Sequence, residues 1–228
     1  MEEQADRRWI VLAGFAVLAA VIVGAILISR SGGEDSDSTT TAAAGAEGCE
    51  QVEAPAPKKV SLPAPKQTLK RGEEATAVVQ TSCGTFEIAL DTERAPKTAN
   101  SFAYLSEEGF YDDLTFPRIA PGFVIQAGSP SNTTIGGPGY SIDEKPPANL
   151  AYTKGTVAMA KTSAEPPGRS GSQFYVVTAA DAGLLPEYAL VGKVSEGLDV
   201  VERIGKLGTP EEKPKQTVLI ETITIEAG

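Results

Sequence analysis

The feature that most restricts the fold of this chain is an uncharged apolar run near its start. Trp9–Ser29 contains 21 residues without a charge, and a helix of that length rises about 30 Å, the thickness of a bilayer core. Two arginines precede the run and one follows it, which favours a cytoplasmic N-terminus. We therefore expect residues 1–8 in the cytoplasm, a transmembrane helix over 9–29, and a single-pass membrane protein with an extracytoplasmic C-terminal domain.

Two other interpretations of the apolar run remain open. A cleaved signal peptide would also begin with an apolar segment, but this run is longer than a usual signal core and no convincing small-x-small site follows it. A lipoprotein would need an acceptor cysteine close to the run, whereas Cys49 lies 20 residues beyond it. The uncleaved anchor is the favoured interpretation.

Residues 30–74 are predicted to be a disordered linker of low complexity. Positions 31–50 carry five acidic residues and no basic residue, with almost nothing to bury. The following stretch EAPAPKKVSLPAPK, at 53–66, contains prolines that favour extended polyproline geometry. The whole chain has a net charge of −10, which makes it a poor binder of nucleic acid, because phosphate contacts need clustered Lys and Arg.

The absence of histidine excludes several chemistries. No residue can serve as the imidazole base of a Ser-His-Asp or Cys-His site, or as a histidine ligand of a metal. The two cysteines cannot form a structural zinc site by themselves. We therefore expect neither a metal nor a cofactor.

The remaining residues, 75–228, have the pattern of one mainly β domain. Ala75–Ser82 and Thr85–Leu90 are strand-like and separated by a short Cys-Gly turn, which predicts a hairpin. Helices are predicted over Lys97–Glu108, with Gly109 as its stop, and over Leu198–Lys206. Further strands are predicted over Phe123–Gln126, Thr156–Ala160, Gln173–Thr178, Ala189–Val194 and Val218–Ile225. Many short strands with two helices favour a closed β-barrel capped by the helices.

One segment of this domain combines an isolated cation with aromatic and amide side chains. The sequence FPRIAPGFVIQAG, Phe116–Gly128, contains Arg118 followed by Phe123 and Gln126. On a regular strand Phe123 and Gln126 would point to opposite faces, although a bend could bring them together. A lone arginine in an apolar stretch more often snorkels or forms a salt bridge than catalyses a reaction.

The order and spacing of five motifs resemble a cyclophilin. After Phe116–Gly128 come GGPGY at 136–140, GTVAMA at 155–160, GSQFYVVT at 171–178 and LVGKVSEGLDVVERI at 190–204. The resemblance covers about residues 75–227 and is closest in type to a bacterial, membrane-anchored peptidyl-prolyl cis-trans isomerase. It implies an eight-stranded antiparallel β-barrel with a helix at each end.

The resemblance also implies site residues. Arg118 falls on the catalytic arginine, Phe123 on the floor of the proline pocket and Gln126 on the polar residue beside it. The substrate-binding positions are Val124, Ala160, Lys161, Gln173, Tyr175, Leu184 and Tyr188. The implied reaction is rotation about Xaa-Pro bonds in exported polypeptides, with the guanidinium stabilising the twisted amide. We expect the protein to be a monomer.

Three departures from the family pattern keep a second interpretation open. Lys161 stands where asparagine is common, Gly183 where many members have tryptophan, and Tyr188 where histidine is common. The chain could then be a catalytically weak domain that binds Pro-containing segments, or a purely structural tethered barrel. Other charged residues of the domain, namely Asp181, Glu187, Glu211 and Glu212, are interpreted as surface charge without a catalytic role.

The two cysteines would both face the exported side of the membrane. Oxidising conditions permit a disulfide between Cys49 and Cys83, which would attach the end of the linker to the predicted hairpin. Two unpaired thiols, or an intermolecular pair, are the alternatives.

Overall fold

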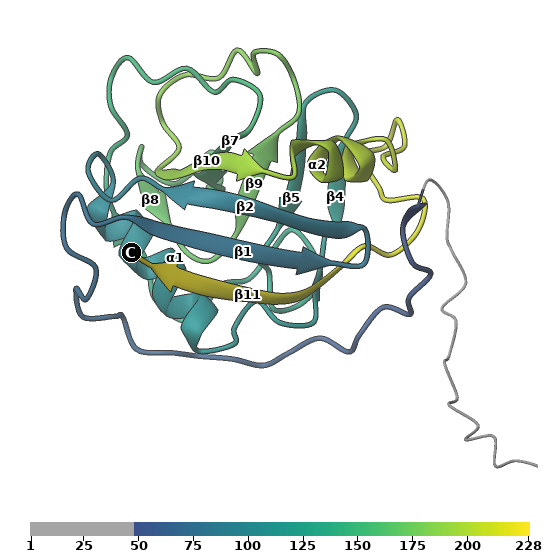
Figure 1. Cartoon of the computed structure of the whole chain (residues 1–228), viewed down its shortest axis with the longest axis horizontal. Coiled ribbons are helices and arrows are strands. Elements are labelled where there is room, and N and C mark those ends of the chain that lie inside the picture. Colours follow the sequence, from purple (N-terminus) through teal and green to yellow (C-terminus); the bar gives the residue numbers. More distant parts are fainter. Residues whose placement is uncertain (1–47) are drawn as a thin grey trace, which may run out of the picture. The chain divides into compact units, whose positions relative to one another are not determined.

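The computed structural model describes residues 48–228, which form a curled antiparallel sheet with two helices (Figure 1). The predicted cytoplasmic segment 1–8, the predicted membrane helix 9–29 and the first part of the predicted linker lie outside the described residues. Within 48–228, neither helix combines the length and the hydropathy that crossing a bilayer requires.

The domain starts with the predicted hairpin. Strands β1 (Ala75–Thr81) and β2 (Gly84–Leu90) pair in antiparallel register from Thr76 opposite Ala89 to Thr81 opposite Gly84. Buried positions alternate along β1, as expected for a strand with one face on the core. The hairpin prediction is confirmed.

Nine strands form the main sheet of the described residues, in the order β3-β11-β1-β2-β10-β7-β9-β5-β4. The strands beyond the hairpin are β3 (Leu114–Thr115), β4 (Arg118–Ala120), β5 (Val124–Ala127), β7 (Thr156–Met159), β9 (Phe174–Val177), β10 (Leu190–Glu196) and β11 (Leu219–Ala227). A separate pair is formed by β6 (Ile142–Asp143) and β8 (Arg169–Ser170).

The expectation of a closed eight-stranded barrel is wrong, because the two end strands of the sheet are not paired with each other in the described part of the chain. Strands β3 and β4 follow one another directly, yet β3 pairs with β11 and β4 pairs with β5. Pro117 lies between them and has no N–H to donate to a ladder. The two edge strands are therefore joined only by the short chain segment between them. In a closed barrel they would also pair through backbone hydrogen bonds.

Both predicted helices are confirmed. Helix α1 (Pro96–Glu107) has proline at its first turn, where the missing N–H costs nothing, and buries Phe102 and Leu105 completely. Gly109, with a φ of 63°, follows the end of α1 in the left-handed conformation that glycine adopts most easily. Helix α2 (Leu198–Gly205) packs against β2 and β5, and α1 packs against β10 and β11.

Two apolar clusters lie on opposite faces of strands β5, β7 and β9. The larger, inner cluster contains Ile125, Val157 and Phe174 together with Phe102 of α1. The smaller, outer cluster contains the intervening residues of the same strands, Val124, Ala158, Tyr175 and Val177. Because side chains alternate along a strand, one set of strands supplies both clusters.

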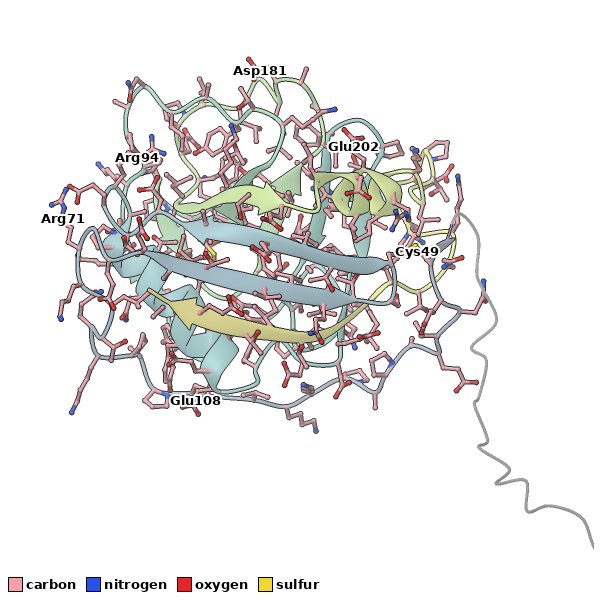
Figure 2. All side chains as sticks on the ribbon, viewed as in Figure 1. Cys49, Arg71, Arg94, Glu108, Asp181 and Glu202 are labelled. Carbon is pink, nitrogen blue, oxygen red and sulfur yellow. A yellow bond between two sulfur atoms is a disulfide. The ribbon has the colours of Figure 1, made fainter. Side chains whose placement is uncertain are left out.

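Residues 48–74, the part of the predicted linker that the structure describes, are held against the domain rather than free of it. We call this segment the strap. A disulfide joins Cys49 to Cys83 beside the β1–β2 turn, 34 residues along the chain, as the cysteine hypothesis stated. Figure 2 marks Cys49 at the start of the strap, and Figure 1 shows the strap passing along the β11 side of the sheet.

Hydrogen bonds to backbone and side-chain acceptors of the domain hold the strap at several points. The Lys58 N–H donates to the Pro130 carbonyl at 2.7 Å, and the Leu62 N–H donates to the Pro138 carbonyl at 2.7 Å. Further along, the Thr68 N–H donates to the Asn100 side chain at 2.7 Å. The strap thus supports the loop that leads from β5 to β6.

Candidate active site

The arginine and the amide singled out in the sequence face each other across two paired strands. Arg118 of β4 is the register partner of Gln126 of β5, so their side chains leave the same face of the sheet. The Arg118 Nη1–H donates to Gln126 Oε1 at 3.1 Å, and the Gln126 Nε2–H donates to Gln173 Oε1 at 3.1 Å. Gln173 in turn donates to the Gly136 carbonyl at 2.9 Å, so a row of polar groups begins at the guanidinium.

Phe123 and Gln126 lie on the same face of the sheet, although on a regular strand they would point to opposite faces. Phe123 lies in the turn before β5 rather than on the strand, and its N–H donates to the Ala120 carbonyl at 3.1 Å. Gly122 permits this turn with a φ of 66°. The Phe123 ring therefore reaches the face that carries Gln126, with its centroid 5.9 Å from the Arg118 guanidinium carbon.

The outer apolar cluster brings together six of the residues expected to form the pocket. Val124 and Tyr175 are buried in it, while Phe123, Ala160, Leu184 and Tyr188 are partly exposed at its margin. Gln173 lies apart, at the far end of the polar row. The result is an apolar surface that adjoins a cation and two side-chain amides.

Three tyrosines pack together in this cluster. The ring of Tyr188 lies edge-on to Tyr152 at 5.9 Å and to Tyr175 at 5.6 Å. The Tyr152 hydroxyl donates to the Tyr188 carbonyl at 2.6 Å, and burial raises the pKa of Tyr152 to about 12. The Tyr175 hydroxyl is buried without a hydrogen-bond partner among the described residues, and desolvation raises its pKa.

Lys161 is placed differently from what its sequence position suggested. Its side chain is only 5% exposed, and its Nζ lies 3.3 Å from Glu187 and 5.4 Å from the centre of the Tyr188 ring. Glu187, interpreted from sequence as surface charge only, is thus the ion-pair partner of this lysine. The ammonium thus contacts the wall of the outer cluster through Glu187 and Tyr188.

A groove of about 820 Å³ continues from the polar row. The loop at 134–141 forms one side of it, and Ala160, Lys161 and Gln173 form part of the other. Because the strap holds Pro130 and Pro138 at their carbonyls, it supports the loop side of this groove.

Glu212 is the residue of this region that sequence reasoning missed. Its Oε2 lies 2.6 Å from the Arg118 Nε, although the two residues are 94 positions apart. The Glu212 side chain is 45% exposed, as expected for a surface carboxylate, but its pairing with Arg118 was not expected. No local pattern could have revealed the contact, because it depends on where the turn after α2 meets β4.

The fold and this arrangement define the class of protein. The cyclophilin type peptidyl-prolyl cis-trans isomerase/CLD family matches residues 76–225. The chain belongs to this family, and it is a peptidyl-prolyl cis-trans isomerase of the cyclophilin type.

Similar proteins come from Aspergillus fumigatus, Mycobacterium bovis and Cryptosporidium parvum. A peptidyl-prolyl cis-trans isomerase-like 1 of Aspergillus fumigatus is 35% identical over 161 residues, covering 68% of this chain and 98% of that protein. A probable peptidyl-prolyl cis-trans isomerase A of Mycobacterium bovis is 35% identical over 170 residues, covering 66% and 92%. A crystal structure of a Cryptosporidium parvum cyclophilin type isomerase, determined in the presence of the dipeptide Ala-Pro, has a TM-score of 0.62 and 28% identity, covering 67% and 99%.

Proposed function

We propose that this isomerase accelerates rotation about Xaa-Pro bonds by donating a hydrogen bond from Arg118 to the prolyl nitrogen. The observation that carries the proposal is the guanidinium itself. It is bonded to Gln126 at 3.1 Å, lies 5.9 Å from the Phe123 ring centre, and borders the outer apolar cluster.

The chemistry of the amide explains why a fixed cation suits this reaction. Resonance gives the peptide bond a rotation barrier of about 18–20 kcal/mol. In the twisted transition state the resonance is lost and the nitrogen regains a lone pair, which can accept a hydrogen bond. A donor that meets this lone pair stabilises the twisted form more than either planar form, and only such a difference accelerates the step.

The neighbouring side chains would bind the two groups on either side of the rotating bond. The apolar cluster around Phe123, Val124 and Leu184 would hold the proline ring still while the other side of the bond turns. Gln126, fixed between Arg118 and Gln173, would bind the carbonyl that rotates. The Cryptosporidium parvum relative crystallised with Ala-Pro supports a Pro-containing peptide as the substrate class.

The substrates would be exported polypeptides, reached by a membrane-anchored monomer. The charge bias around Trp9–Ser29 supports this topology, and the Cys49–Cys83 disulfide supports an oxidising compartment. In intact spheroplasts that express the full chain, added protease should digest the domain and the chain should sediment with membranes. A domain protected from protease, or a chain found only in the soluble fraction, would refute the anchor.

The isomerase mechanism is tested with the full chain and an Ala-Pro peptide in a protease-coupled assay. We expect Arg118→Ala to lower kcat/KM by about 10²–10³-fold, the usual effect of removing one preorganised donor. Arg71→Ala is the matched control, because Arg71 is 68% exposed and pairs with Glu93 at the protein surface. Peptide binding with no rate gain in the wild type would instead support the weak-binding alternative.

A further inference from the structure

We infer that Glu212 is a positioning residue, which holds the Arg118 guanidinium in the orientation that isomerisation requires. This inference rests on the proposed function, since it concerns how the proposed donor is held. Glu212 takes the Nε–H of Arg118 at 2.6 Å while Gln126 takes an Nη1–H at 3.1 Å. These are the two hydrogen bonds that the guanidinium donates. Its Nη2 group has no hydrogen-bond partner among the described residues.

An arginine side chain needs such support because it is long and flexible. Its free rotation must be lost before a donor can meet a lone pair that forms only in the transition state. Anchors at Nε and Nη1 fix the plane of the guanidinium, whereas Gln126 alone would fix only one corner. The directions of the remaining N–H bonds are then fixed as well.

The turn that carries Glu212 is built onto the strand that carries Arg118. The Ile119 N–H of β4 donates to the Glu212 carbonyl at 2.9 Å, so the strand residue next to Arg118 binds the backbone of Glu212. Gly208, where the turn begins, approaches so closely that a Cβ there would lie 2.4 Å from the Ile119 carbonyl. The position of the carboxylate is therefore tied to the position of β4.

The backbone of Glu212 is unusual for a residue with a side chain. Its φ of 60° lies in the left-handed region, which costs free energy for residues other than glycine. The turn is closed around it, since its N–H donates to the Thr209 carbonyl at 2.9 Å and the Lys213 carbonyl accepts from the Thr209 N–H at 2.9 Å. A glycine would adopt this conformation at less cost, but it would not provide a carboxylate for Arg118.

The ion pair is too exposed to exist chiefly for stability. The Arg118 and Glu212 side chains are 28% and 45% exposed, and exposed pairs contribute little to folding. The adjacent Glu211 makes no hydrogen bond or ion pair with any residue between 48 and 228. The two neighbouring glutamates therefore offer a matched comparison of a positioned and an unpositioned carboxylate.

The test compares three variants of the full chain in the Ala-Pro assay. We expect Glu212→Ala to lower kcat by about five- to tenfold with KM changed less than twofold, because the lost interaction acts on the transition state. Glu212→Gln keeps an oxygen that can accept the Nε–H and should recover most of the lost kcat. The control Glu211→Ala should behave as the wild type, and thermal unfolding checks that all three variants are folded.

Other outcomes would overturn the inference. These are a Glu212→Ala loss no larger than that of Glu211→Ala, a loss confined to KM, or a gain in kcat. An NMR spectrum supplies a second readout: the Arg118 Nε–H signal, resolved and slow to exchange in the wild type, should broaden in Glu212→Ala and persist in Glu212→Gln. Absence of turnover in the wild type would refute the proposed function instead, while the NMR comparison would still test whether Glu212 holds Arg118.

Discussion

The inner and outer apolar clusters use opposite faces of the same strands. They differ in the burial of their aromatic rings and in whether their buried hydroxyls are hydrogen-bonded. In the inner cluster, the rings of Phe102, Tyr111 and Phe174 pack at 5.1–5.5 Å, and the Tyr111 hydroxyl donates to the Ser172 carbonyl. In the outer cluster, Phe123 is partly exposed and the Tyr175 hydroxyl is buried without a protein partner in the described residues. The comparison indicates that the inner face carries most of the stability of the fold, and the outer face is the one on which the proposed substrate pocket lies.

Two phenylalanine-to-alanine substitutions should separate these roles. Phe102 is completely buried, so Phe102→Ala should lower the free energy of unfolding by about 3–5 kcal/mol. Phe123→Ala should lower it far less, because that ring is partly exposed, yet should reduce kcat/KM by at least tenfold. Chemical denaturation and the Ala-Pro assay measure the two effects. Equal destabilisation by both variants would contradict the division between the faces.

The disulfide tests how far the strap shares in the stability of the inner face. Replacing both Cys49 and Cys83 by serine should cost about 2–4 kcal/mol, because the crosslink closes a long loop in the unfolded chain. The strap should also lose hydrogen-exchange protection at Leu62 and Thr68, whose N–H groups are bonded to the domain. A reductant should destabilise the wild type but leave the double variant unchanged. Equal sensitivity of the two proteins would indicate that the crosslink contributes nothing.

The buried tyrosines provide the smallest effect and a pH dependence. Tyr175→Phe should raise the free energy of unfolding by about 1 kcal/mol, because it removes a buried hydroxyl without a partner among the described residues. Burial raises the pKa of Tyr152 from an ordinary value of 10.0 to about 12, and burial also raises the pKa of Tyr175. Below pH 10 these tyrosines are protonated in both the folded and the unfolded chain, so their raised pKa values leave the stability unchanged there.

Above pH 10 the unfolded chain loses the tyrosine protons before the folded one does, so stability should fall as the pH rises towards 12. Tyr175→Phe should show a smaller fall than the wild type in urea unfolding measured at a series of pH values. The half-buried Tyr104 supplies a control in the variant Tyr104→Phe. If the wild type and Tyr175→Phe lose stability in parallel, the Tyr175 hydroxyl is ionising freely in the folded protein.

The local elements of the domain were predictable because each has a strong local cause. The period-two pattern of β1 and β2, the proline at the start of α1 and Gly109 after its end act over a few residues. Whether the sheet closes into a barrel was not predictable in the same way. Whether the sheet closes depends on which partners β3 and β4 choose on either side of Pro117, and both partners are distant in sequence.

The candidate site shows the same limit at the level of single residues. The spacing of Arg118, Phe123 and Gln126 identified them through the family resemblance, but only the turn before β5 explains how Phe123 reaches the face of Gln126. The pairing of Lys161 with Glu187 had no signal in the sequence. Composition predicted an extended segment around the strap prolines, but it gave no information about the carbonyls to which Lys58 and Leu62 bond.

The sequence alone thus determined the elements of this protein, its family resemblance and the residue types at its proposed centre. These follow from local periodicity, turn chemistry and the spacing of motifs, which are properties of neighbouring residues. The tertiary structure decided that the sheet is open, that the strap is fixed to the domain and that Glu212 holds Arg118. Each of these is a contact between distant segments, and such contacts depend on how the whole chain packs.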